Sequence, residues 1–231
     1  MKQTSYFVGY RLVDTYRLGG ASRGLTALAG LVAACLSLVT VRGLLTHNWW
    51  FFVMLTWNLF LAIFPLGVVL VLRDLRAAGF RGRGLLATGL AGWLVFLPNA
   101  PYLITDLFHI RSVQEPLLWF DTMTLFLFAL TGLLAGLYSS LIAHRLLRPL
   151  VGAGPAWALL LGCQGLAGFG IYLGRFGRWN SWHVLTKPVA LFDALVAAGH
   201  DHLSLKLTVA YGFVLAVLYV AFYHYVEHDR Q

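Results

Sequence analysis

The sequence predicts an all-α membrane protein, a polytopic bundle of about six transmembrane helices. Only 11% of the 231 residues are charged and 59% are hydrophobic, and the mean hydropathy is +0.75. Soluble domains average about 25% charged residues, so this chain has too few charges to cover a water-facing surface. Its apolar runs lack the two-residue alternation of a transmembrane barrel, which leaves helices as the structure that satisfies a backbone within lipid.

Six segments contain no Asp, Glu, Lys or Arg and are near or above the roughly 20 residues that cross the hydrocarbon core. They are 24–41, 43–72, 84–105, 122–144, 149–174 and 207–226. We expect a single membrane domain over residues 1–231, with spans near 24–42, 49–72, 84–105, 117–143, 154–174 and 204–226. The basic, aromatic stretch before Arg23 is expected to lie along the membrane surface as a separate segment.

The basic residues predict the orientation, because loops on the cytoplasmic side of a membrane contain an excess of Lys and Arg. One side receives Lys2, Arg11, Arg17, Arg23, Arg73, Arg76, Arg81, Arg83, Arg145, Arg148 and Arg230, and the other receives Arg42, Arg111, Arg175, Arg178, Lys187 and Lys206. Both termini are therefore expected in the cytoplasm, with the chain in the inner membrane of a bacterium. The net charge of +8 is spread over loops, which argues against a nucleic-acid partner and leaves the lipid bilayer as the expected one.

The third span ends in an unusual stretch, FLPNAPYLITD at residues 96–106. Pro98 and Pro101 lack an amide donor and disfavour helical geometry at the residue before them, so the helix is expected to distort there. The carbonyl groups of Leu94 and Leu97 should lose their usual partners. In lipid such groups would be costly, so they are expected to face protein or a water-filled cavity.

Small residues recur in the fourth and fifth spans. The fourth contains Gly132 and Gly136, a GxxxG spacing that lets two helix backbones approach closely. The fifth has a ridge of glycines that should pack tightly against a neighbouring helix: Gly162, Gly165, Gly168, Gly170 and Gly174.

The connection from 175 to 204 is too long for a simple hairpin, and a connection of this length is expected to contain secondary structure of its own. Thr186-Lys-Pro188 has the features of a helix start, and apolar residues then recur at helical spacing: Val189, Phe192, Leu195 and Val196. We expect a short helix on the outer membrane interface, covering whatever lies beneath it.

Polar side chains from four spans fall at this same outer level. They are Asn58, Asn99, Tyr102, Asp106, His109, Asp121, Arg175, Arg178, Asn180, Trp182 and His183. Ionisable groups at membrane depth are costly and are usually functional or paired with each other. One interpretation is a structural lock, in which Asp106 and Asp121 neutralise Arg175 and Arg178.

A second interpretation is a metal-dependent membrane hydrolase. Carboxylate and imidazole groups are suitable ligands for a divalent, zinc-like ion with one position left for water. The candidate ligands are Asp106, His109, Asp121 and His183, of which Asp106, His109 and Asp121 would be catalytic. No HExxH-like spacing joins them.

The preferred interpretation is a site that binds or processes an anionic or lipid-linked ligand. Arg175 and Arg178 would form bidentate hydrogen bonds to a phosphate, a carboxylate or a lipid head group. The ligand-binding residues would be Asn58, Asn99, Tyr102, Arg175, Arg178, Asn180 and Trp182. The sequence leaves open whether the protein is an enzyme.

Several motifs resemble a bacterial family of multi-pass membrane proteins, the domain of unknown function 1361 family. They are Trp57-Asn-Leu-Phe-Leu-Ala62, the 96–106 stretch, Gly170-Ile-Tyr-Leu-Gly-Arg175 and Arg178-Trp-Asn-Ser-Trp182. The resemblance covers about residues 50–187. It implies a membrane architecture and supplies no activity.

Overall fold

The computed structural model describes residues 4–80, 82–112 and 115–228. In chain order the elements are α1 (Thr4–Thr46), α2 (Trp50–Ala77), α3 (Arg83–Phe96), α4 (Asn99–Tyr102), η1 (Leu103–Ser112), η2 (Glu115–Leu117), α5 (Leu118–Val151), α6 (Ala153–Arg175), α7 (His183–Thr186), α8 (Pro188–Gly199) and α9 (His202–His228). Here α denotes an α-helix and η a 3-10 helix. Within these residues no strand forms, so the predicted all-α class is confirmed.

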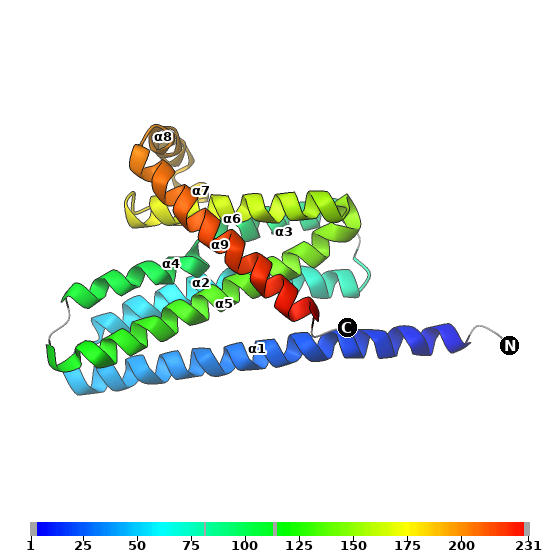
Figure 1. Ribbon diagram of the computed structural model, residues 1–231, viewed down its shortest axis with the longest axis horizontal. Helices are drawn as coiled ribbons and strands as arrows, with labels where there is room; N and C mark the ends of the chain where they lie inside the picture. Colours follow the sequence, from blue (N-terminus) through cyan, green and yellow to red (C-terminus); the bar gives the residue numbers. More distant parts are fainter. Residues whose placement is uncertain (1–3, 81, 113–114, 229–231) are drawn as a thin grey trace.

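Six helical segments are long and apolar enough to cross a membrane, as predicted. They are Arg23–Thr46, Trp50–Ala77, Arg83–Ile110, Leu118–Val151, Ala153–Arg175 and His202–Glu227. The first turn of α1 and the last turn of α9 lie toward the same end of the bundle (Figure 1). The ends of α1 and α6, with α7 and α8, lie toward the opposite end, here termed the distal end.

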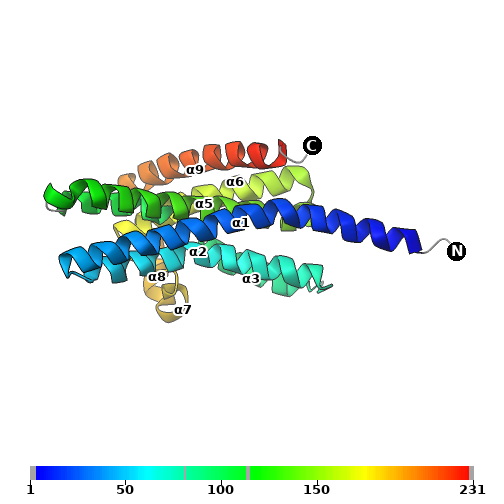
Figure 2. The ribbon, with the colours of Figure 1, turned by 90° about the horizontal axis from the view of Figure 1, so that it is seen from below.

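The first helix differs from the expected arrangement. α1 is one continuous helix from Thr4 to Thr46, and its N-terminal part extends past the rest of the bundle (Figures 1 and 2). The expected separate surface segment before Arg23 is therefore wrong. The stretch contains no proline that would end the helix before the first span.

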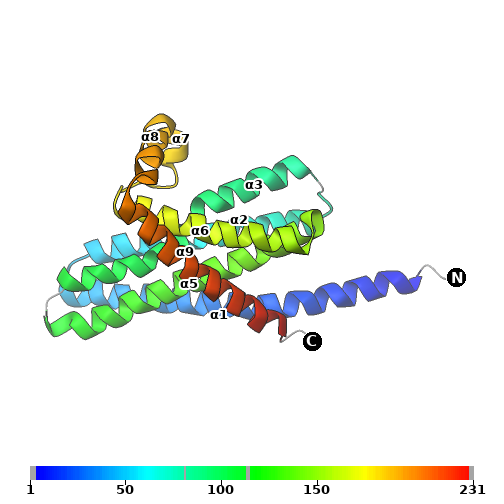
Figure 3. The same ribbon diagram turned by 45° about the horizontal axis from the view of Figure 1, so that its top comes forward.

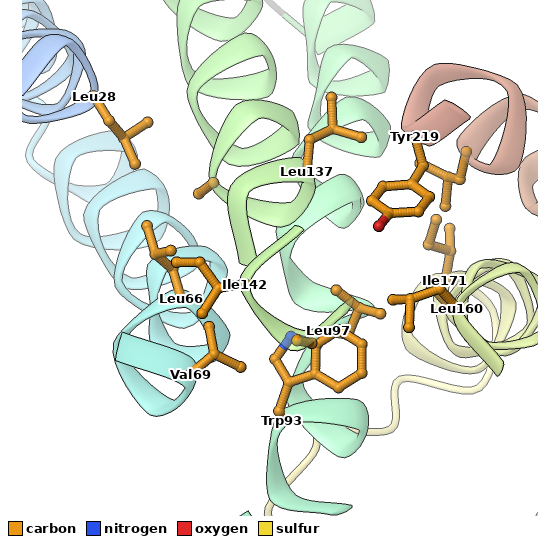
Figure 4. Packing of buried hydrophobic residues seen from close by; sticks show 14 residues of the cluster. Leu28, Leu66, Val69, Trp93, Leu97, Leu137, Ile142, Leu160, Ile171 and Tyr219 are labelled. Carbon is orange, nitrogen blue, oxygen red and sulfur yellow. The ribbon is translucent and has the colours of Figure 1, made fainter. Parts of the chain in front are cut away.

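α5 is the central helix of the bundle. It packs against α1, α2, α4, η1, α6 and α9. In its most apolar stretch of 18 residues, 67% of the residues are buried, against 17–44% in the corresponding stretches of the other spans. Figure 4 shows Leu137 and Ile142 of α5 among side chains of neighbouring helices, including Trp93 and Tyr219. Because lipid is as apolar as leucine, such contacts stabilise the bundle mainly through van der Waals packing.

The glycines of the fourth span allow α5 to approach the proline-containing stretch. A methyl group on Gly132 would lie 2.5 Å from the carbonyl oxygen of Ala100, and one on Gly136 would lie 3.0 Å from the Ala100 side chain. From the other side, a methyl group on Gly170 of α6 would lie 2.4 Å from Pro98. The stretch is therefore held between two helices whose closest residues have no side chain.

The predicted glycine ridge of α6 also packs against α9. A methyl group on Gly168 would lie 2.7 Å from the backbone nitrogen of Gly212, and one on Gly212 would lie 2.9 Å from the Cα of Gly165. The two backbones are in direct contact. Such contact between small residues is a common basis for helix association in membranes.

The distal connection contains the expected short helix. α8 begins at Pro188, in the first-turn position where proline is favoured. It runs across the bundle helices instead of along them (Figures 2 and 3). Three of the four apolar residues that predicted it are exposed: Val189 by 74%, Phe192 by 64% and Val196 by 50%.

The contact at Gly132 predicts a specific effect of substitution. Gly132→Ala should lower the apparent melting temperature, because the added methyl group meets a backbone oxygen and overpacking costs about 1–3 kcal/mol. Gly162→Ala is the matched control, because nothing lies within 4 Å of its added methyl group and alanine is favoured in helices by roughly 0.5–1 kcal/mol. Thermal unfolding of detergent-purified protein measures both. An equal response of the two variants would contradict the close approach.

Candidate functional site

The proline-containing stretch bends the third span without opening it. α3 ends at Phe96, and both Leu97 (φ −52°, ψ −41°) and Pro98 (φ −58°, ψ −26°) keep helical dihedral angles. One further turn, α4, follows, and the chain then continues as the 3-10 helix η1. The predicted distortion is therefore present as a change of helix type.

Most of the carbonyl groups at this bend acquire new partners. Leu97 loses its usual partner as expected, because the residue four positions later is Pro101, and its carbonyl accepts a hydrogen bond of 3.1 Å from the Ala100 amide instead. The Phe96 carbonyl accepts one of 3.0 Å from the Asn99 side chain, and the Val95 carbonyl accepts one of 2.9 Å from the Ser181 hydroxyl. Leu94 also loses its usual partner, because the residue four positions later is Pro98.

Asn99 and Ser181 join the bend to the distal connection. The Asn99 Nδ2 donates to Ser181 Oγ at 2.9 Å, and Ser181 donates in turn to Val95. Nearby, the rings of Trp57 and Trp182 meet edge to face with centroids 6.1 Å apart. The segment around Ser181 is therefore held against both α2 and the bend.

A second hydrogen bond holds the other end of the connection. The Tyr172 hydroxyl of α6 donates to the Asp201 carboxylate at 2.5 Å. This bond holds the pKa of Asp201 below its usual value, with help from the backbone amide of Leu203. The start of α9 is thereby fixed to the last turns of α6.

Asp106 is buried, with 2% of its surface exposed. It accepts a hydrogen bond of 2.9 Å from the Asn58 side chain, and it interacts electrostatically with His109 and Arg175. The Arg175 guanidinium lies 5.4 Å from the centre of the Phe108 ring, within cation–π range. The structure therefore brings Asn58 and Asp106 into direct contact, with His109 and Arg175 in their surroundings.

Asp121 belongs to a different cluster. Its carboxylate accepts two hydrogen bonds from Arg42, Nε to Oδ1 at 2.8 Å and Nη2 to Oδ2 at 2.9 Å. The guanidinium also lies 3.9 Å from the Phe51 ring centre. Asp121 therefore pairs with Arg42 and not with Arg175 or Arg178 as expected. Because α1 extends beyond Arg42, it places the Arg42 guanidinium inside the bundle.

The predicted metal ligands are not gathered into one site. In the part of the chain that the structure describes, no three His, Cys, Asp or Glu side chains lie together in a way that could hold a metal ion. Asp121 is engaged by Arg42, whereas His183 accepts a hydrogen bond of 3.2 Å from the Asn180 amide and packs edge-on against Trp179. The arrangement does not favour Asp106, His109 and Asp121 as a catalytic metal set.

A pocket of about 350 Å³ lies between the bend, α2, α6 and the distal connection. It is lined by Asn58, Leu61, Leu94, Val95, Pro98, Asn99, Tyr102, Leu166, Phe169, Gly170, Leu173, Gly174, Trp179, Asn180, Ser181, Val184, Leu191 and Leu195. Most of the wall is apolar, and the polar groups come from the bend, from α2 and from residues 179–181. Every lining residue is uncharged at neutral pH.

Sequence reasoning identified part of this pocket. Asn58, Asn99, Tyr102 and Asn180 line it as expected, whereas Arg175, Arg178 and Trp182 do not. Arg178 is exposed, with φ of 54°. Ser181 was missed. The usable signal was that carbonyl groups in a helix without amide donors need another donor, which a serine hydroxyl can supply.

Comparison with known proteins gives one family match. The model of a family described as "Protein of unknown function (DUF1361)" matches residues 57–218. This range is more than half of the chain and includes every residue that lines the pocket. No curated protein and no solved structure matches the chain.

The buried Arg42–Asp121 pair predicts a large effect on stability. Asp121→Asn should destabilise the protein by about 3–5 kcal/mol, because Arg42 would remain buried without its counter-charge. The matched control is Asp74→Asn, whose partner Arg73 is 30% exposed, and an exposed pair contributes only about 0–1 kcal/mol. Thermal unfolding in detergent, followed by tryptophan fluorescence, compares the two.

The double variant Arg42→Met with Asp121→Leu removes both charges and should recover most of this loss. A decrease in melting temperature for Asp121→Asn no greater than that for Asp74→Asn would contradict a stabilising role of the buried pair.

Proposed function

The chain belongs to the DUF1361 family of proteins of unknown function, and from this premise we propose that it binds an amphiphilic ligand, a lipid or a lipid-linked compound. The ligand would occupy the pocket between the bend, α6 and the distal connection. The observation that supports this proposal is the composition of the pocket, whose wall is apolar on most sides and polar on one. Such a wall suits a molecule with an apolar chain and a polar head.

The size of the pocket agrees with this proposal. Its volume of about 350 Å³ lies within the range of about 300–1,000 Å³ that is usual for small-molecule sites. That volume suits a head group and the first part of one chain, with the rest of the chain outside. The polar groups Asn58, Asn99 and Ser181 are fixed by hydrogen bonds within the protein, and such preorganisation reduces the entropy lost on binding.

The surroundings of the pocket favour entry from the membrane. Two of its lining residues, Leu166 and Val184, are 54% and 41% exposed, and they adjoin surfaces that a bilayer would cover. α8 contributes Leu191 and Leu195 to the pocket and exposes apolar side chains on its other side. A helix of this kind suits the interface between lipid and water.

The alternatives have weaker support. A metal-dependent hydrolase would need a ligand set, and none is formed within the described residues. A purely structural or assembly protein agrees with the buried Arg42–Asp121 pair, but that role requires no pocket.

For location, we propose the inner membrane of a bacterium with the distal end toward the periplasm. The excess of basic residues in the loops and terminal segments at the other end supports this orientation. The pocket would then open near the outer leaflet.

Filling the pocket should prevent ligand binding. Leu173→Trp replaces a lining residue with a larger side chain. The unsubstituted protein is expected to copurify with a lipid in native mass spectrometry, and this variant is expected to lose it. Leu161→Trp is the matched control: it lies on the same helix, is 38% exposed and is not a lining residue. Retention of the same lipid by both variants would contradict the proposed site.

The proposed orientation can be tested by labelling. In a variant with Cys35 and Cys163 replaced by Ala, a cysteine introduced at His200 should react with a membrane-impermeant maleimide in intact spheroplasts. A cysteine introduced at Arg73, at the other end of the bundle, should react only after lysis. The opposite pattern would reverse the orientation.

A further inference from the structure

The Asn99 amide has a fixed orientation in the pocket wall. One side-chain atom faces the Phe96 carbonyl at 3.0 Å and the Ser181 hydroxyl at 2.9 Å. A backbone carbonyl only accepts hydrogen bonds, so this atom must be the Nδ2 nitrogen, and these two bonds use both of its N–H groups. The Oδ1 oxygen remains, and it only accepts.

Ser181 is restricted in the same way. Its single hydroxyl hydrogen is donated to the Val95 carbonyl at 2.9 Å, and its oxygen accepts from Asn99. Any further hydrogen bond made by this hydroxyl would have to be accepted from a ligand.

Two lining residues, Leu94 and Val95, also have backbone carbonyl groups, which only accept hydrogen bonds. The Leu94 carbonyl lacks its usual helical donor because Pro98 has no N–H. The Val95 carbonyl has two lone pairs and accepts from Ser181. Asn99, Ser181 and these carbonyls therefore form a surface that can accept hydrogen bonds but cannot donate them, which is termed the acceptor wall below.

No positive charge offsets this surface within the pocket. All its lining residues are uncharged at neutral pH. The nearby Asp106 carboxylate accepts a hydrogen bond from the lining residue Asn58. Arg175 lies over Phe108 instead. Neutral donors are also present in the pocket lining, outside the acceptor wall: they come from Tyr102, Trp179, Asn180 and the second N–H of Asn58.

We infer that the head group of the bound amphiphile is a hydrogen-bond donor, a hydroxyl or a protonated amine, and not a phosphate, sulfate or carboxylate. This inference rests on the proposed function and defines the class of its ligand. An anionic head has only acceptors, so it would leave the acceptor wall unpaired and would bury a charge without a counter-charge. This inference keeps the lipid-linked ligand of the sequence interpretation and proposes a donor in place of its anionic head group.

Three amphiphiles with the same tail test the head group directly. The probes are octyl glucoside with hydroxyl donors, octylammonium with charged donors, and octyl sulfate with acceptors only. Binding is measured by calorimetry on the full-length protein in phosphatidylcholine nanodiscs, with empty nanodiscs subtracted. Octyl sulfate should bind at least about tenfold more weakly than octyl glucoside or octylammonium, because sites built for a donor reject analogues that lack it. Tighter binding of octyl glucoside than of octylammonium identifies the head group as a hydroxyl, and the reverse identifies it as a protonated amine.

A variant pair tests whether the pocket wall determines this preference. Asn180→Arg places a cation on the wall at an exposed residue whose side chain makes no hydrogen bond within the described residues. It should strengthen octyl sulfate binding by about tenfold relative to octyl glucoside. Thr186→Arg, in the same segment but outside the pocket, should leave the ratio unchanged.

The outcomes separate the two proposals. If octyl sulfate binds as tightly as octyl glucoside and octylammonium, or more tightly, the donor preference is overturned while the amphiphile site stands. If no probe gives saturable heat above empty nanodiscs, the proposed site fails and the donor preference fails with it. An equal change of the ratio in Asn180→Arg and Thr186→Arg would also overturn the role of the wall.

Discussion

The need to satisfy backbone carbonyl groups inside a membrane organises this protein. Pro98 and Pro101 remove two amide donors from the third span, and lipid offers no replacement. Compensation comes from a change to 3-10 hydrogen bonding, from the Asn99 side chain and from Ser181 in a distant segment. The glycines of α5 and α6 allow two helices to enclose the bend closely. A local deficit in hydrogen bonding thereby determines how four segments of the chain meet.

The same residues give the pocket its chemical character. Asn99 donates to the Phe96 carbonyl and to the Ser181 hydroxyl, and Ser181 donates to the Val95 carbonyl. The polar atoms that these two side chains leave for a ligand are therefore acceptors. Two of the charges that the sequence places at the same level are engaged elsewhere, because Arg175 lies over the Phe108 ring and Asp121 pairs with Arg42. The site is thus polar without being charged, and its apolar walls come from α6 and α8.

The fold was predictable because its signals are local in the chain. Apolar length predicted six spans, the prolines predicted the bend, and glycine spacing predicted the helix contacts. Contacts between distant segments were harder to predict. Arg42 resembles an ordinary charge flanking a span, and its partner Asp121 lies 79 residues away. Which arginines face a pocket depends on the rotation of each helix about its axis, and a short polar cluster does not fix that rotation.

The Arg42–Asp121 pair also has a consequence for biogenesis. A chain is made from its N-terminus, so α1 reaches the membrane before α5 has been synthesised. Until the fourth span arrives, the Arg42 charge has no Asp121 to meet and must stay near water or lipid head groups. The final seating of α1 against the bundle is therefore a late event, completed only after the central helix has inserted.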